Sequence, residues 1–219
     1  MREDVYALHQ RLRMPEPARV ISRTRLGMQL SMFYSQKCDQ IFRVESSIEL
    51  DYAHFLEWSK EVQLYLPQPI SVTYVQRGKR SLYTPDFFHV TTQYANVITE
   101  IKPKGWDESP FYREKFELIA HCLANEGKQF QVVTDADLRK GCLIANLRYL
   151  YPFFRTSSPS DLLAVVLALR KAGGQARVKA LLDDNPDLQF SALAAFAYEN
   201  WAQIEDFPFD YDSVLTLED

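Results

Sequence analysis

The chain has 219 residues, of which 47% are hydrophobic and 13% aromatic, which suits one medium domain with a sizeable core and a small appendage. No window approaches the roughly 18–20 apolar residues that span a bilayer, and the first ten residues contain no apolar signal core, so we expect a soluble, intracellular protein. The three cysteines are far apart, and neither C-x-x-C nor H-E-x-x-H spacing occurs, which argues against a disulfide scaffold and against a zinc site.

The net charge of −4 is unevenly distributed along the chain. Residues 1–43 carry a net charge of +4, residues 44–155 of −1 and residues 156–219 of −7. The basic N-terminal arm is suited to DNA phosphates, with the acidic C-terminal segment suited to a protein partner. Arg19, Arg23 and Arg25 are candidate DNA contacts of this arm, although a solvated surface explains the same charges.

The first half of the chain predicts mostly strands around one helix. Residues 1–13 are weakly helical, residues 14–40 have no clear period, and residues 41–46 read as a short strand. Ser46 and Ser47 begin a helix that runs to about Trp58, and the leucines and prolines of residues 64–69 end that unit. Three further strands follow at residues 70–76, 83–90 and 97–102; the basic turn RGKRS precedes the second and TTQYAN the third.

The second half predicts mostly helices. A helix at residues 111–127, a buried strand at 130–135 and a mostly helical stretch at 136–154 complete an α/β core with a mixed central sheet, residues 1–155. Residues 156–219 then predict a small helical domain, with three helices and a C-terminal hairpin over residues 204–219 in a winged-helix-like pattern. Its acidity argues against a role in reading DNA.

The two strands around TTQYAN bring charged residues together. If the turn is centred near Tyr94, antiparallel pairing places Asp86 opposite Lys102 and Phe88 opposite Glu100. Residues that are directly opposed, or two apart on one strand, share a face of the sheet. We therefore expect Asp86, Glu100 and Lys102 to converge at one end of this hairpin, with the Ile101 side chain in the core and its backbone carbonyl free as a ligand.

Metal-assisted phosphodiester hydrolysis needs this combination of groups. Carboxylate oxygens hold Mg²⁺ or Mn²⁺, the cation activates water, and a lysine orients that water or balances charge on the phosphate. The P-D…E-x-K pattern resembles the PD-(D/E)xK nuclease fold, although a surface hairpin with an ion pair has the same spacing. A further carboxylate is expected from the preceding helix, where Glu49 fits; Ser46 and Glu49 also form a capping box, in which Glu49 only stabilises the helix.

The blocks SSIELDYAHFLEW, PQPISV, YTPDFFHV, ITEIKPK and FQVVTD resemble, in order and spacing, the TnsA-type endonuclease subunit of heteromeric transposases, over about residues 46–150. The resemblance implies a restriction-endonuclease-like core in which Glu49, Asp86, Glu100 and Lys102 are the catalytic residues. Glu49, Asp86, Glu100 and the Ile101 carbonyl would hold the metal. Some relatives have glutamine where this chain has Glu100.

The resemblance also implies partners and a cellular setting. The family cuts the 5′ strands of double-stranded DNA at transposon ends, a sister DDE-type transposase cuts and joins the 3′ strands, and an AAA+ ATPase regulates both, in the bacterial cytoplasm. We expect the acidic segment to contact the ATPase, so that deletion of residues 158–219 would abolish this contact. Lys104, Arg77, Lys79 and Arg80 are candidate phosphate contacts, or else solvated turn residues.

Two other functions remain open from the sequence. One is a stand-alone restriction or repair nuclease, which would cut DNA without a partner. The other is a non-catalytic module that binds DNA or a protein through the same fold.

Overall fold

The computed structural model describes residues 30–217, which divide into two compact units with the boundary between Asp137 and Leu138. Among residues 30–217, no helix has the length and apolar character needed to cross a bilayer.

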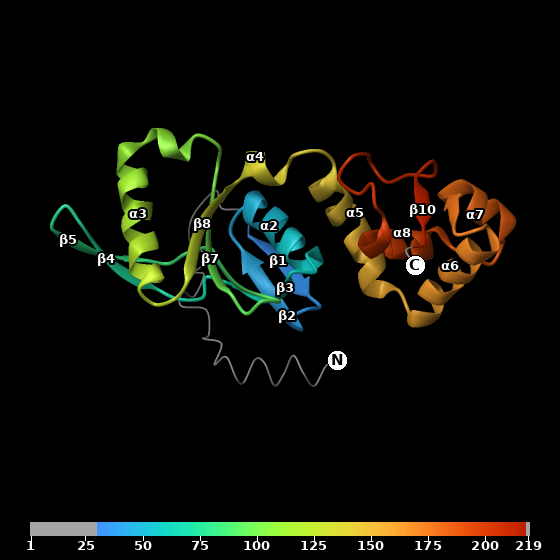
Figure 1. Ribbon diagram of the computed structural model, residues 1–219, viewed down its shortest axis with the longest axis horizontal. Helices are drawn as coiled ribbons and strands as arrows, with labels where there is room; N and C mark the ends of the chain where they lie inside the picture. Colours follow the sequence, from blue (N-terminus) through green and yellow to red (C-terminus); the bar gives the residue numbers. More distant parts are fainter. Residues whose placement is uncertain (1–29, 218–219) are drawn as a thin grey trace. The chain divides into compact units, whose positions relative to one another are not determined.

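The first unit is built around a four-stranded sheet in the order β3-β6-β7-β8 (Figure 1). Its strands are β3 (Val62–Pro67), β6 (Phe87–Thr91), β7 (Asn96–Lys102) and β8 (Gln129–Thr134). The β3–β6 and β6–β7 pairs are antiparallel and the β7–β8 pair is parallel. The predicted α/β core with a mixed central sheet is therefore confirmed.

Two helices pack against this sheet and its flanking hairpin. The helix α2 (Ser47–Trp58) contacts β3 and β7, and α3 (Pro110–Ala124) contacts β8 and the flanking strand β4 (Val72–Gln76). Ser46 caps α2 by accepting a hydrogen bond from the Glu49 amide at 3.1 Å, as the sequence predicted. A short 3₁₀ helix η1 (Trp106–Glu108) and a single turn α4 (Asp135–Leu138) complete the connections.

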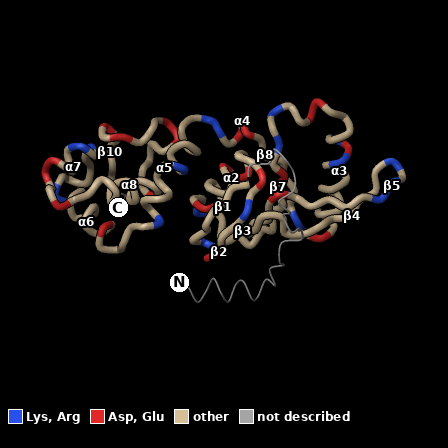
Figure 2. Tube along the Cα trace, turned by 180° about the vertical axis from the view of Figure 1, so that it is seen from behind, with Lys and Arg blue, Asp and Glu red and all other residues tan. Residues whose placement is uncertain are grey.

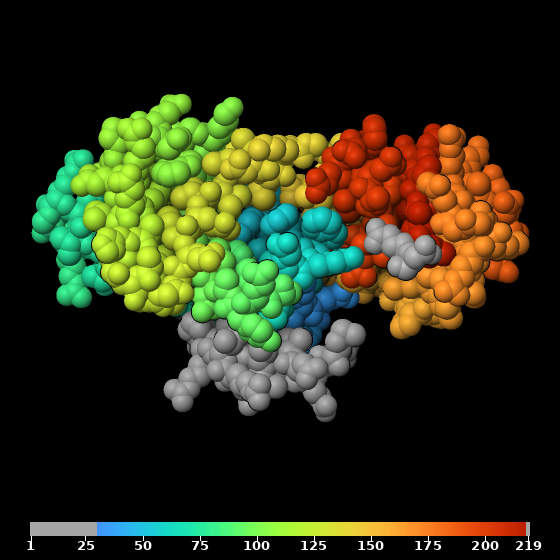
Figure 3. Space-filling model, viewed as in Figure 1, coloured from blue at the N-terminus to red at the C-terminus, as the bar shows by residue number. Residues whose placement is uncertain are grey.

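Two hairpins flank the central sheet. One consists of β1 (Ser31–Ser35) and β2 (Gln40–Val44), and the other, which we call the ribbon, of β4 (Val72–Gln76) and β5 (Lys79–Tyr83). The inner face of the ribbon packs on α3, and together their side chains form a continuous surface (Figure 3). The outer face leaves Val75 57% and Leu82 69% exposed.

Strands β1, β3 and β5 were not predicted from the sequence. β3 is an almost continuously buried run, VQLYLP, which lacks the period-two alternation that identifies a half-buried strand. β5 depends on a tight turn at Arg77 and Gly78, whose φ values of 51° and 75° are both in the left-handed region. A two-residue turn of this kind matches the twist of a hairpin, so the strand resumes at Lys79, where the sequence indicated a longer turn.

The second unit is mainly helical. It contains α5 (Leu143–Thr156), α6 (Pro159–Lys171), α7 (Val178–Asp184) and α8 (Phe190–Asn200), with a small antiparallel pair of β9 (Gln175–Arg177) and β10 (Val214–Thr216). The hairpin expected within residues 204–219 was wrong, because β10 pairs with the distant β9. α8 is buried from Ala192 to Tyr198 and has no basic residue, so it offers no recognition helix, and the predicted winged-helix-like domain is not confirmed.

Helix α5 belongs to this second unit, where the sequence placed the boundary after residue 155. Asn146, 3% exposed, donates to the carbonyls of Ile204 and Phe207, both at 2.7 Å, and accepts from the Phe209 amide at 2.9 Å. Gly141 has a φ of 62°, and a Cβ there would lie 2.3 Å from the Glu205 carbonyl oxygen. Residues 138–155 add four basic residues to this unit. Residues 138–219 therefore carry a net charge of −3 and are less acidic than residues 156–219, whose net charge is −7.

Candidate active site

The β6–β7 hairpin positions the predicted acidic residues. Phe87 lies across from Thr99 and Phe88 across from Ile98, so continuing the same register by one residue places Asp86 across from Glu100. The predicted pairs, Asp86 with Lys102 and Phe88 with Glu100, were wrong by two residues because the turn is centred one residue earlier. A shift by an even number keeps every side chain on its face of the sheet, so Asp86 and Glu100 still lie on one face.

Asp86 is held by backbone amides of β7 and of Gln68, the residue after β3. Its carboxylate oxygen Oδ2 accepts a hydrogen bond from the Ile101 amide at 2.7 Å, and its carbonyl accepts from the Gln68 amide at 2.8 Å. Burial raises the pKa of Asp86 well above its usual value, with further increases from the charges of Glu100 and Glu49. The Ile101 bond and Lys102 act in the opposite direction without cancelling the increase.

Glu100 is buried and has a donor at each carboxylate oxygen. The Tyr83 hydroxyl donates to Oε2 and the Lys102 ammonium to Oε1. Lys102 also lies 3.3 Å from the Ile101 carbonyl oxygen, so this carbonyl, which was expected to be free, has a donor. The Ile101 side chain is buried as predicted, 6% exposed.

Glu49 takes part in the cap of α2 and also lies near the hairpin carboxylates. Its oxygens accept hydrogen bonds from the Ser46 hydroxyl and the Glu45 amide, both at 2.9 Å, so the capping interaction is present. Burial raises the pKa of Glu49, and Glu45 and Glu100 raise it further, while Glu49 in turn raises the pKa of Asp86. Glu49 is thus a helix cap within electrostatic range of both hairpin carboxylates.

These groups have the chemistry of a site for a hard divalent cation. Within residues 30–217, no three Asp, Glu, His or Cys side chains are grouped closely enough, as they are placed, to hold a metal. The donors at hand are carboxylate and carbonyl oxygens, the ligands that Mg²⁺ and Mn²⁺ prefer. Burial and then repulsion from Glu100 and Glu49 raise the pKa of Asp86, and a cation would relieve this repulsion. The donor set therefore fits, provided that Glu100 turns from Lys102 toward the ion.

Comparison with known families identifies the domain. Residues 59–135 match the TnsA-like endonuclease N-terminal family. This segment is a TnsA-like endonuclease domain. Asp86, Glu100 and Lys102 lie within the matched stretch, and Glu49 lies ten residues before it. A comparison with curated proteins gives no match.

Two residues of the TnsA-like domain join the site without having been predicted. Tyr83, at the end of β5, donates to Glu100, and burial followed by the Glu100 charge raises its pKa far above the usual range. Lys115, on α3, has its ammonium 4.4 Å from the centroid of the Tyr83 ring. Tyr83 stands next to the T-P-D block, a signal that the sequence offered, whereas no local pattern marks Lys115.

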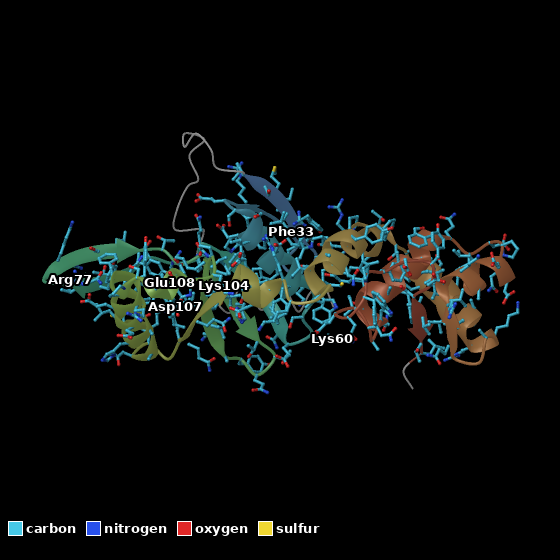
Figure 4. The ribbon with its side chains drawn as sticks, turned by 90° about the horizontal axis from the view of Figure 1, so that it is seen from above. Phe33, Lys60, Arg77, Lys104, Asp107 and Glu108 are labelled. Carbon is cyan, nitrogen blue, oxygen red and sulfur yellow. The ribbon has the colours of Figure 1, made fainter. Side chains whose placement is uncertain are left out.

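The predicted DNA contacts lie in separate parts of the chain. Arg77 lies at the tip of the ribbon (Figure 4), where its guanidinium pairs with Glu114 of α3 at 3.0 Å. Lys79 and Arg80 are exposed beside it, which gives the ribbon tip its basic character (Figure 2). Lys104 is exposed just after β7, and its backbone amide donates to Asp135 at 2.8 Å. Arg19, Arg23 and Arg25 lie outside the described residues.

We predict that Asp86→Asn stabilises the protein in the absence of metal. Because the pKa of Asp86 is raised on folding, its contribution to stability is fully present below the ordinary Asp pKa and is lost as pH rises through the folded-state pKa. At neutral pH the variant should melt roughly 2–4 °C higher, about 1 kcal/mol for a chain of this size. The difference should vanish in melting curves recorded toward pH 4, and a variant that melts lower than wild type at neutral pH would contradict the prediction.

We predict that the two roles of Glu49 separate by mutation. Ser46→Ala removes the cap hydroxyl and should cost about 1 kcal/mol in urea unfolding, with little effect on binding of a divalent cation. Glu49→Gln keeps an oxygen that can accept from Glu45, so it should melt near wild type, yet Mg²⁺ should raise its melting temperature less. An equal Mg²⁺ response in wild type and Glu49→Gln would leave Glu49 as a cap alone.

Proposed function

We propose that this chain is the endonuclease subunit that cuts the 5′ strands at transposon ends, by Mg²⁺- or Mn²⁺-dependent hydrolysis, during cut-and-paste transposition. The observation that supports it most directly is the placement of Asp86 and Glu100 across from each other, with Lys102 bonded to Glu100, inside the TnsA-like domain. No position of the P-D…E-x-K pattern is missing from this set.

Each residue of the β6–β7 hairpin has its own role in the proposed reaction. A bound divalent cation supplies Lewis acidity toward the phosphate and lowers the pKa of a water molecule. Asp86, Glu100 and the Ile101 carbonyl would hold it, with Glu49 adding charge from the start of α2. The Ile101 amide fixes the direction of the Asp86 carboxylate through its 2.7 Å bond. This preorganisation means that the carboxylate does not have to be ordered when substrate arrives.

Lys102 is suited to act on the attacking water. Its ammonium contacts both Glu100 and the Ile101 carbonyl, so it stays beside the groups that would hold the cation. From there it can orient the water and offset the negative charge that develops on the phosphate. The aromatic ring of Phe116, 5.7 Å from the ammonium, closes one side of the lysine.

The proposed DNA substrate enters along the ribbon. Lys79 and Arg80 at the ribbon tip offer exposed charges for the duplex backbone, and Tyr83 at the other end of β5 contacts Glu100. Five residues of extended strand span roughly 13 Å, so the tip would touch phosphates a few base pairs from the cut. Such contacts position DNA without reading its sequence, so the sister DDE-type transposase would select the ends.

The decisive experiment measures cleavage of each strand separately. The chain is mixed with the transposase from the same element, DNA with both transposon ends and Mg²⁺, and wild type is compared with Asp86→Ala. We expect the variant to lose 5′-strand cuts by at least about 10³-fold, because a ligand of the cation is removed, with 3′-strand cuts retained. Identical cleavage by both proteins would leave the site structural and favour a non-catalytic module, and cleavage without the transposase would favour a stand-alone nuclease.

We propose that the second unit, residues 138–219, is the contact for the AAA+ ATPase. A cut at residue 158 would separate α5 from α8, against which it packs, so it would damage the unit as well as remove it. The exposed acidic residues at 183, 184 and 187 carry the charge argument.

We predict that Asp183→Lys with Asp187→Lys, in the full chain, weakens capture of the ATPase at least about fivefold, because attraction between exposed charges becomes repulsion. Residues 1–137 alone should fail to capture it. Charge reversal at Asp107, an exposed residue of the first unit, is the matched control. Full capture by the double variant would remove the electrostatic argument.

A further inference from the structure

Lys115 occupies a place beside the candidate active site that the proposed mechanism does not use. It lies on α3 and is half-buried, with its ammonium 4.4 Å from the ring centroid of Tyr83 and 5.1 Å from that of Phe116. The same Tyr83 ring carries the hydroxyl that donates to Glu100. Lys115 therefore contacts two aromatic rings, and the Tyr83 side chain links it to the Glu100 carboxylate.

The ammonium of Lys115 has donors without a partner. Among residues 30–217, it makes no hydrogen bond or ion pair with a protein acceptor, whereas Lys128, just after α3, pairs with Glu126. Burial lowers the pKa of Lys115. The charges of Glu100 and Asp86 raise this pKa and the charge of Lys102 lowers it, so all three groups lie within electrostatic range of the Lys115 ammonium. Because no protein acceptor in the described part of the chain uses these donors, they are available to an anion that enters the site.

The protein itself does not supply that anion. Both oxygens of Glu100 already have donors, from Tyr83 and from Lys102, and Asp86 accepts from the Ile101 amide. Both lysines lie near the Phe116 ring, at 5.7 Å for Lys102 and 5.1 Å for Lys115. An anion that reaches the Asp86–Glu100 pair therefore meets two ammonium groups, of which only Lys102 is already engaged.

We propose that Lys115 is a substrate-binding residue whose ammonium holds a non-bridging phosphate oxygen of the DNA strand positioned at Asp86, Glu100 and Lys102. This inference rests on the proposed function. It gives the two lysines different roles, because Lys102 acts on the attacking water beside the Ile101 carbonyl whereas Lys115 takes the charge of the phosphodiester. The Tyr83 ring, which contacts Lys115 and bonds to Glu100, fixes the distance between the phosphate-binding ammonium and the carboxylates.

The test compares Lys115→Met with wild type. Methionine keeps the aliphatic contact with Tyr83 and removes the charge. DNA binding is measured by anisotropy over a range of salt, in an Asp86→Asn background that prevents cutting. One lost phosphate contact should weaken binding about five- to tenfold at low salt. It should also make the dependence of log Kobs on log[salt] shallower by about 0.9. Lys115→Arg should restore the slope, and Lys128→Met, the same charge change near the end of α3, should not alter it.

A second measurement uses the complete complex. With the transposase present, Lys115→Met should slow single-turnover 5′-strand cleavage at least tenfold and leave 3′-strand cleavage unchanged. If Lys115→Met does not fold, Lys115→Gln replaces it, with the same expected effect on the two cleavage rates. Without DNA, the Mg²⁺ concentration that gives half of the thermal shift should not rise. A higher Mg²⁺ requirement would make Lys115 a positioning residue for the carboxylates and overturn the proposal.

The outcomes distinguish this inference from the function on which it rests. If wild type neither binds DNA nor cuts 5′ strands in the complex, the proposed function fails and the inference fails with it. If wild type cuts and Lys115→Met matches it in rate and salt slope, the function stands and Lys115 has no role in holding phosphate.

Discussion

The hydrogen bond from the Ile101 amide to the Asp86 carboxylate sets the geometry of the whole site. It prolongs the β6–β7 pairing by one residue, but with a side-chain oxygen as the acceptor. Asp86 is thereby fixed next to Glu100, in a partly buried place where two negative charges repel each other, and its pKa is raised as a result. Such crowding destabilises the folded chain by itself, and the divalent cation proposed for this site would relieve it.

The aromatic residues at the end of the ribbon connect this hairpin to α3. Tyr83 donates to Glu100 and lies under the Lys115 ammonium, and its ring centroid is 6.1 Å from that of Phe116. One ring therefore links a strand, a helix and the carboxylates. The ribbon tip, with its exposed basic residues, is attached to the same segment. A shift in β5 would therefore move the proposed substrate contacts and the Glu100 carboxylate together.

The second unit follows different constraints. Asn146 satisfies three backbone groups of the loop at residues 204–209 from inside α5, and Gly141 leaves room for the Glu205 carbonyl. These contacts tie α5 to the C-terminal part of the chain and explain why the boundary lies at residue 137. This boundary also brings four basic residues into the unit, so the unit is less acidic than residues 156–219, which the sequence indicated as the ATPase contact.

The sequence by itself determined the helices, three of the four strands of the central sheet and the position of Asp86, Glu100 and Lys102 on one hairpin, because side-chain alternation and short motifs are local. It placed the acidic pair on one face even with the register two residues out, since a shift by an even number preserves the face. Only the tertiary structure decided which residues pair across β6 and β7, that Glu49 caps α2 while acting on Asp86, and that Lys115 reaches the site. Those contacts depend on how α2 and α3 pack on the sheet, and no spacing along the chain encodes the distance between two such elements.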